Sequence, residues 1–285
     1  MSYAQTRMRI HHLNCATFCP PLVGKRLNDE GFLVCHCLLV ESPVGLILVD
    51  TGLGQKALAN PSLHMPPGTS FLLGPKLDPT ETALRQIERL GHSARDVRHI
   101  LLTHLDFDHA GGLSDFPEAK VHVFEDEYQA AMRPAGYMER TRYVEPLWEH
   151  GPHWQRHRMQ GGDAWFGFAS VRALPNVPGL SDEILIVPVP GHSRGHCAIA
   201  VKTQPRWLLH CGDAYFYQGE MDASGRRCTG LLGGFQTVAQ FDGDDRRANQ
   251  ERLRQLAIAH GDQVQLFCAH DPSEFQRLSD GKRGG

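Results

Sequence analysis

Four side chains that can bind a metal ion lie within six residues of this chain: His104, Asp106, Asp108 and His109. Taking so many polar groups out of water side by side costs several kcal/mol unless a cation or other partners compensate. The apolar run 100–103 before them is typical of a buried strand, and Gly111-Gly112 after them allows a tight turn. The pattern predicts a ligand loop at the end of a strand that serves two adjacent metal positions. A surface loop merely rich in His and Asp is the alternative, in a chain with 17 His.

Three later apolar segments end in the same way. Segment 184–190 is followed by Gly191-His192, segment 207–211 by Gly212-Asp213, and segment 264–268 by Ala269-His270. A single His after a strand is commonly a solvated turn residue. Together with the loop at 104–109, however, these residues form a consistent set of metal ligands.

The chain resembles the metallo-β-lactamase-fold hydrolases, whose signature is His-x-His-x-Asp-His, then Gly-His, Gly-Asp and a final His, preceded by Asp-Thr-Gly. Here Asp50-Thr51-Gly52 supplies the early motif, and the resemblance extends from about Gly31 to Asp271. The most similar branch is that of the N-acyl-homoserine lactonases. The segments that carry this likeness are 75–77, 109–112, 127–131, 137–139 and 190–196. The resemblance implies an α/β fold, an αββα sandwich of two mixed β-sheets flanked by helices, in a single domain over residues 1–285.

The resemblance also implies a ligand set for two divalent metal ions. His104, Asp106 and His192 would bind the first ion, Asp108, His109 and His270 the second, and Asp213 would bridge them. Asp106 departs from the family, which has His at that position. The extra carboxylate makes the site more neutral and harder, so iron or manganese join zinc as candidates. Replacing Asp106 by His is accordingly expected to shift the preference toward zinc.

The activity that this family implies is hydrolysis of a carbonyl ester, a lactone above all, by a metal-activated hydroxide. Asp108 would carry a proton to the leaving alkoxide. The tyrosine that contacts substrate in the lactonase branch is Phe216 here, so Tyr215 or Tyr217 is predicted to take its role, with packing at a strand edge as the alternative.

Asp50 and His196 are read as groups that orient the ligands. Three other functions remain open. One is cleavage of thioesters, as in glyoxalase II; another is an iron-dependent redox enzyme of the same fold; the third is a non-catalytic binding protein.

Composition and charge limit the kinds of partner that the protein is expected to bind. The net charge is −3 and no Lys-rich run occurs, which argues against nucleic acid as a partner. The resemblance implies a small apolar ester or lactone as the substrate. No signal-like start and no apolar stretch of membrane-spanning length is evident, so a cytoplasmic location without a membrane partner is expected. Most of the 8 Cys lie in strand-like runs, where Cys behaves as a small apolar residue, and a zinc knot formed by Cys15, Cys19, Cys35 and Cys37 is the alternative.

Hydrophobic periodicity and turn residues predict the regular elements. The expected strands are 32–40, 45–49, 98–103, 121–124, 184–190, 197–203, 206–211 and 264–269, and the expected helices are 80–90, 125–132 and 244–260. Residues 133–168 are expected to form an irregular aromatic-rich insertion that either lines an apolar pocket or forms a satellite core. The loop 65–73 could cover the pocket or a homodimer interface, and the tail 279–285 is expected to be disordered.

Overall fold

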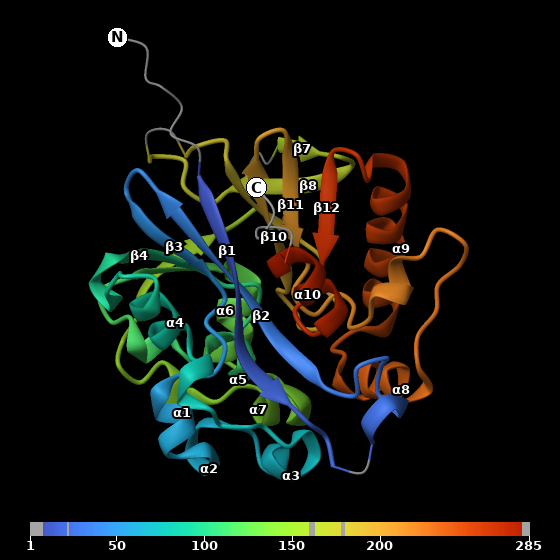
Figure 1. Ribbon diagram of the computed structural model, residues 1–285, viewed down its shortest axis with the longest axis horizontal. Coiled ribbons are helices and arrows are strands. Elements are labelled where there is room, and N and C mark those ends of the chain that lie inside the picture. The colour runs from blue at the N-terminus through green and yellow to red at the C-terminus, as the bar shows by residue number, and fades with distance from the viewer. Residues whose placement is uncertain (1–7, 22, 160–162, 178–179, 281–285) are drawn as a thin grey trace.

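The computed structural model describes residues 8–21, 23–159, 163–177 and 180–280. It contains two six-stranded sheets packed face to face, with helices on both outer sides (Figure 1). This is the αββα sandwich that the sequence predicts.

The first sheet has the strand order β1-β2-β3-β4-β5-β6. Its strands are β1 (Arg9–Phe18), β2 (Leu33–Ser42), β3 (Gly45–Val49), β4 (Val97–Leu101), β5 (Lys120–Phe124) and β6 (His153–His157). β1, β2 and β3 pair antiparallel, and β3 to β6 pair parallel. β2 and β3 correspond to the predicted strands 32–40 and 45–49 and form a hairpin, with Ser42 opposite Gly45 at its turn.

The second sheet has the order β12-β11-β10-β9-β8-β7. Its strands are β7 (Asp163–Trp165), β8 (Phe168–Arg172), β9 (Ile184–Pro188), β10 (Cys197–Thr203), β11 (Arg206–His210) and β12 (Val264–Phe267). The pairs are antiparallel except for β11 with β12, which are parallel. The parallel pair brings the ends of β11 and β12 to the same edge.

In the described part of the chain, seven helices lie on the side of the first sheet, two lie between β11 and β12 in sequence, and one follows β12 (Figure 1). The first group is α1 (Gln55–Ala59), α2 (Pro61–His64), α3 (Thr69–Leu73), α4 (Ala83–Arg89), α5 (Phe107–Ala110), α6 (Glu125–Met132) and α7 (Tyr137–Arg142). The second group is α8 (Gly230–Ala239), α9 (Gly243–His260) and α10 (Pro272–Asp280). Short 3-10 helices cover Gly24–Arg26, Pro79–Glu81, Ala94–Asp96, Leu113–Asp115, Glu145–Leu147 and Gln218–Met221.

Alternating residues of the strands divide the core into three apolar layers. Leu38 and Ile47 of the first sheet meet Ile186 and Ile199 of the second in the middle layer. The opposite faces of the two sheets pack against the helices. Because burial of apolar surface is the main favourable term in folding, the shared middle layer holds the two sheets together.

Several expected elements differ from the structure. The insertion 133–168 is not irregular, since it contains α7, β6, β7 and the start of β8. Hydrophobic periodicity does not reveal β6, because β6 is an edge strand with mostly exposed side chains. Helix α4 begins at Ala83, after the cap Thr82, whose Oγ1 accepts a hydrogen bond from the backbone of Arg85. Thr80, where this helix was expected to begin, lies in the 3-10 helix Pro79–Glu81.

The aromatic residues of this insertion lie mainly in the core. Tyr143 and Trp148 are buried in the layer beneath the helices of the first sheet, and Trp154 packs against that layer. Trp165 and Phe168 belong to the layer beneath α9. Packing therefore explains these residues better than a substrate pocket does.

Two further expectations concern the loop 65–73 and the C-terminal tail 279–285. In the loop 65–73, Met65 is buried whereas Phe71 and Leu72 of α3 are exposed. The expected disorder does not extend to Ser279 and Asp280, which form the end of α10. Residues 281–285 lie outside the described part of the chain.

Candidate metal centre

Loops at the ends of four strands bring the seven predicted ligands together. His104 and Asp106 follow β4, and Asp108 and His109 begin α5. The other three, His192, Asp213 and His270, follow β9, β11 and β12. Their ligand atoms form overlapping groups in which all atoms lie within 4.8 Å of one another. The first sheet thus contributes four of these side chains and the second sheet three.

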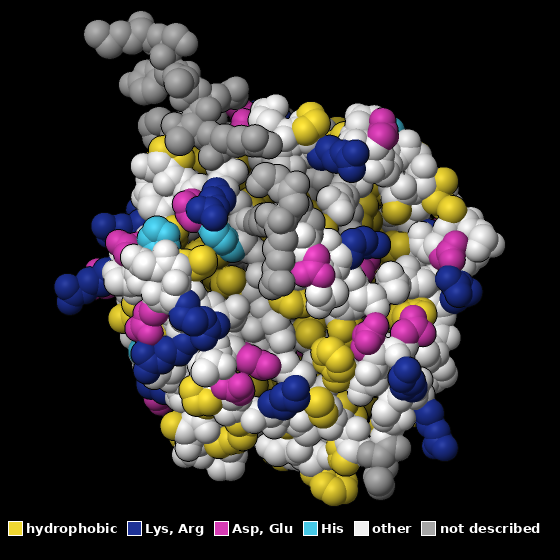
Figure 2. All heavy atoms as spheres, viewed as in Figure 1, with side chains coloured by type: hydrophobic (Ala, Val, Ile, Leu, Met, Phe, Trp, Pro, Cys, Tyr) yellow, Lys and Arg dark blue, Asp and Glu magenta, His cyan; other side chains and the backbone are white. Residues whose placement is uncertain are grey.

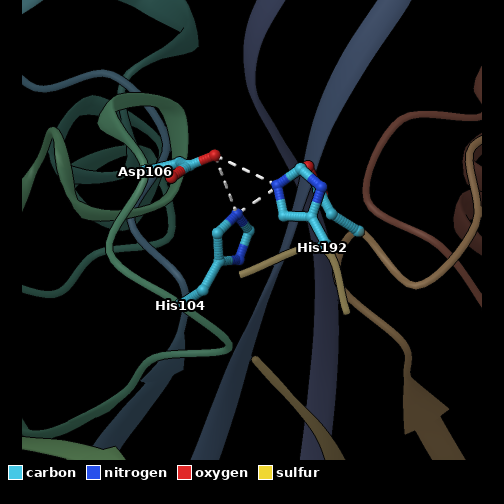
Figure 3. Close-up of side chains that lie close together, drawn as sticks. His104, Asp106 and His192 are labelled. Atoms are coloured by element: carbon cyan, nitrogen blue, oxygen red, sulfur yellow. Dashed lines mark hydrogen bonds and ion pairs between the residues drawn. The ribbon is translucent and has the colours of Figure 1, made fainter. Parts of the chain in front are cut away.

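The first metal position is formed by His104, Asp106 and His192, whose polar atoms point toward one another (Figure 3). Asp106 Oδ2 lies 3.1 Å from His192 Nε2 and 3.5 Å from His104 Nε2. Asp213 Oδ2 completes the group, at 3.3 Å from His192 Nε2 and 3.7 Å from His104 Nε2. Two imidazoles and two carboxylates therefore surround one point.

The second metal position uses the other oxygen of Asp213. Asp213 Oδ1 lies 3.0 Å from His270 Nε2 and 3.1 Å from His109 Nε2. Asp108 flanks them, at 3.7 Å from His270 Nε2 and 4.0 Å from His109 Nε2. The two oxygens of Asp213 are thus divided between the two positions, as a bridging carboxylate requires.

The protonation of the rings shows that a cation fits this arrangement. His270 Nδ1 lies 2.8 Å from the carbonyl oxygen of Val34. Because a carbonyl can only accept, Nδ1 carries the proton, and in the neutral ring Nε2 presents a lone pair. That lone pair faces the Asp213 carboxylate, so two acceptors meet unless a proton or a metal ion lies between them. His104 Nε2, His109 Nε2 and Asp213 Oδ1 are likewise buried without a hydrogen-bond partner.

A buried carboxylate fixes the orientation of His109. Asp50 Oδ2 lies 2.8 Å from His109 Nδ1, and Thr103 donates to both Asp50 oxygens from its backbone N and its hydroxyl, at 2.8 Å each. Burial alone would raise the pKa of Asp50, but His109 outweighs it and holds this pKa at about 2. Asp50 itself has a left-handed backbone, with φ 54°. The predicted role of Asp50 in orienting a ligand agrees with these contacts.

His196 holds the backbone of Asp213 in place through a hydrogen bond. Its Nε2 accepts a hydrogen bond from the backbone N of Asp213 at 2.9 Å, and its Nδ1 lies 3.1 Å from the carbonyl oxygen of Val189. Gly212 has φ 51°, and a Cβ there would lie 2.6 Å from His196 Nε2. The turn before Asp213 therefore requires glycine.

Arg142 of α7 is a site residue that the sequence did not indicate. Its Nε lies 3.6 Å from Asp106 Oδ1, on the side of the carboxylate away from the histidines, and its Nη1 donates to the carbonyl oxygen of His192 at 2.8 Å. Its Nη2 donates to the carbonyl oxygen of Ala239. Burial would raise the pKa of Asp106, but Arg142 and His104 hold it well below its usual range. Arg142 thus orients Asp106 and balances its charge.

Glu127 of α6 is a second unforeseen residue. Its Oε1 accepts from the backbone N of Leu105 at 3.0 Å and from the hydroxyl of Tyr143 at 3.1 Å. Its Oε2 accepts from the Ser193 hydroxyl at 2.6 Å and from the backbone N of Gly195 at 3.0 Å. One buried carboxylate therefore joins the loop of His104 to the loop of His192.

Neither tyrosine predicted to be catalytic has its hydroxyl in this cluster. Tyr215 is buried and donates to Glu274, and Tyr217 donates to Asp29 at 2.8 Å. Both line a separate surface depression with these carboxylates. Phe216 instead stacks on His270, with ring centroids 4.8 Å apart, and forms an apolar wall beside the metal positions.

A buried His/Asp cluster at the ends of strands in an αββα sandwich defines a metal-dependent hydrolase. The chain belongs to the metallo-beta-lactamase superfamily, which it matches over residues 31–258.

Named relatives agree with this assignment. A probable metallo-hydrolase of Mycobacterium tuberculosis is 41% identical over 276 residues, covering 96% of this chain and 83% of the relative. An N-acyl homoserine lactonase of Bacillus thuringiensis is 30% identical over 181 residues, covering 64% of this chain and 62% of the relative. The sequence likeness to the lactonase is thus partial.

Solved structures share the fold. An N-acyl homoserine lactone hydrolase with the product N-hexanoyl-L-homoserine at its catalytic metal centre aligns over 95% of both chains, with a TM-score of 0.65 and 22% identity. A dizinc quorum-quenching lactonase aligns over 93% of this chain and 88% of its own, with a TM-score of 0.61 and 16% identity.

On the face shown in Figure 2, Lys and Arg side chains are interspersed with Asp and Glu side chains. Among the described residues, no helix is both long and apolar enough to cross a membrane.

Proposed function

We propose that this protein hydrolyses a small apolar lactone at a dinuclear centre, with His104, Asp106 and His192 on one ion, Asp108, His109 and His270 on the other, and Asp213 between them. The division of the two Asp213 oxygens between two sets of imidazoles carries the proposal. Two divalent ions bound there would supply a nucleophilic water at neutral pH and would polarise the substrate carbonyl.

The exposure of the side chains indicates where substrate approaches. His104 and His109 are almost fully buried, whereas the side chains of Asp106 and Asp108 keep 15% and 10% of their exposure. The open side of the centre is therefore the carboxylate side. A carboxyl group there can hold a proton and deliver it to the leaving alcohol oxygen, and we assign this step to Asp108.

The apolar wall favours a lactone with an apolar substituent. Phe216 lies against His270, and Phe235 of α8 makes an edge contact with Phe216, with centroids 5.5 Å apart. Phe235 is exposed, as are Leu231 and Val238 on the same helix. The lactonase relatives support this substrate class.

The test combines metal analysis with a substrate panel. Protein purified without added metal should contain close to two divalent ions per chain, and it should cleave acyl lactones faster than aryl esters or thioesters. Asp213→Asn should lose metal from both positions and most activity, because it removes the shared ligand. His153→Ala, at an exposed histidine of β6, is the matched control and should retain both. A metal-free native protein, or faster cleavage of thioesters than of lactones, would contradict the proposal.

A further inference from the structure

We propose that the Cys35 thiol is an additional ligand at the second metal position, so that the centre has one oxygen-rich half and one half with a sulfur donor. This inference rests on the proposed dinuclear site and assigns to it a residue that sequence reasoning treated as a small apolar side chain.

The position of Cys35 carries the inference. Cys35 lies on β2 and is 1% exposed. Its Sγ, a carboxylate oxygen of Asp108 and a ring nitrogen of His270 all lie within 4.8 Å of one another. For Zn–S and Zn–N bonds of ordinary length, neighbouring donor atoms on one ion are roughly 3.0–3.5 Å apart, so these atoms need to approach by up to roughly 1.3–1.8 Å. Rotation of a side chain suffices for such a movement.

Backbone contacts on both sides of Cys35 hold it next to His270. The backbone N of His36 donates to the carbonyl oxygen of Ala269 at 2.9 Å, and His270 Nδ1 donates to the carbonyl oxygen of Val34 at 2.8 Å. The backbone N of Cys35 itself donates to Asn14 Oδ1 at 3.1 Å. β2 is therefore fixed against the loop that carries His270, and Cys35 cannot move away without breaking these bonds.

Burial alone does not distinguish Cys35 from Cys37. Cys37, two residues along the same strand, is also 1% exposed, and like Cys35 it is not in a disulfide. Among the described residues, only Cys35 of the eight cysteines belongs to a group of potential metal ligands.

The two halves would then differ in metal preference. The first position offers two carboxylates and two imidazoles, a set that accepts the harder ions iron and manganese as well as zinc. A thiolate at the second position favours softer ions such as zinc, and cobalt(II) can take the place of zinc as a spectroscopic probe.

Cobalt(II) spectroscopy tests this assignment. The metal-free protein is loaded with two equivalents of cobalt(II) and its absorption is recorded. Visible d–d bands report bound cobalt with any ligands, and an intense near-ultraviolet charge-transfer band reports a cobalt–thiolate bond. The native protein and Cys37→Ser should show both features. Cys35→Ser should keep the visible bands and lose the charge-transfer band.

The other outcomes separate this inference from the proposed function. Visible bands without a charge-transfer band in the native protein, or a charge-transfer band that persists in Cys35→Ser, would overturn the role of Cys35 and leave the metal centre standing. Absence of visible bands would overturn both. If Cys35→Ser does not fold, X-ray absorption at the zinc edge of the native zinc protein decides, because a sulfur neighbour at about 2.3 Å is either present or absent.

Discussion

At the scale of single residues, the unusual ligand Asp106 has a partner that offsets its charge. Asp106, Asp108 and Asp213 place three negative charges around two divalent ions, where the family pattern has two. Arg142 lies 3.6 Å from Asp106 and restores one positive charge. In a water-poor site such a buried pair interacts more strongly than at the surface, and leaving either partner alone is unfavourable.

This pairing adds a cost in metal affinity to Asp106→His, for which the sequence alone predicts only a shift of preference toward zinc. Imidazole in place of Asp106 would leave the Arg142 guanidinium unpaired beside a cation site. We expect the single variant to bind the first ion at least tenfold more weakly than the native protein, a loss of about 1.4 kcal/mol. The double variant Asp106→His/Arg142→Met should recover the affinity. Competition with a chelator, followed by metal analysis, measures both.

Arg140→Met is the matched control, because Arg140 lies on α7 two residues away and is exposed. Combined with Asp106→His it should recover nothing. Equal metal affinity in Asp106→His and in the double variant with Arg142→Met would show that Arg142 does not balance the site.

The proposed ligands were visible in the sequence because they lie in short segments that follow apolar strands. Arg142 and Glu127 carry no such signal, since a charged residue on a helix is ordinarily solvated. Arg142 lies 36 positions from Asp106 in sequence, and only the fold of α7 brings them together. The sequence did not mark Cys35 as a possible ligand, because its apolar surroundings resemble those of any buried cysteine.

At the scale of elements, strands with a continuous apolar run were predictable, and β1, whose run is interrupted by half-buried polar residues, was not. β1 was missed because His12 and Asn14 interrupt its apolar pattern. These polar groups are satisfied inside the fold, since His12 Nδ1 lies 2.7 Å from His36 Nε2 and Asn14 bonds to Cys35. Hydrophobic periodicity cannot detect a strand whose polar residues pair with another strand.

A row of histidines across β4, β5 and β6 gives a prediction at this scale. His99 Nδ1 lies 2.9 Å from His122 Nε2, and His122 Nδ1 lies 2.9 Å from His157 Nε2. A neutral His122 fits this row, because it donates from one ring nitrogen and accepts at the other. Burial, and then the neighbouring histidines, lower the pKa of His122 to about 2.

Because the pKa of His122 in the folded state lies below its unfolded value of about 6.5, folding disfavours its protonation. The fold loses no stability through His122 above pH 6.5, and it loses up to about 1.4 kcal/mol per pH unit below that value. His122→Gln, which keeps a donor and an acceptor, should flatten the decline in unfolding free energy between about pH 6.5 and 4.5. Urea unfolding of the metal-free proteins measures this. His153→Ala should follow the native curve, and a decline in His122→Gln parallel to the native one would refute the prediction.

At the scale of the whole molecule, the metal centre joins the two sheets. The loop 104–109 belongs to the first sheet, whereas His192, Asp213 and His270 follow strands of the second. The resemblance in sequence predicted the sandwich, but no pattern in the sequence gives the packing of one sheet on the other. That packing depends on side chains from distant segments, such as Leu38 against Ile186, which meet only after folding.

Metal binding should therefore stabilise the whole fold. Without ions, several inward-facing atoms of the centre, His104 Nε2, His109 Nε2 and Asp213 Oδ1, are buried without a hydrogen-bond partner. An ion at a thousand times its dissociation constant stabilises the folded state by about 4 kcal/mol, provided that it does not bind the unfolded chain. For a chain of this size each kcal/mol raises Tm by roughly 2–4 °C, so a chelator should lower Tm by about 10 °C. Differential scanning calorimetry with and without chelator measures the shift.

Hydrogen exchange shows where the metal-free protein loses stability. A loss confined to the ligand loops would indicate a metal bridge between the sheets rather than a general effect of the chelator. In metal-free protein, hydrogen exchange should accelerate in the loops 104–109, 191–196, 212–214 and 268–271, because these segments lose their common partner. The hairpin of β2 and β3, held by its own ladder of hydrogen bonds, should exchange as before. Asp213→Asn should show the lower Tm already without chelator and should respond little to its addition, because the ligand shared by both positions is gone. A native protein with the same Tm and the same exchange pattern in both conditions would show that the two sheets are held together by their apolar layer alone.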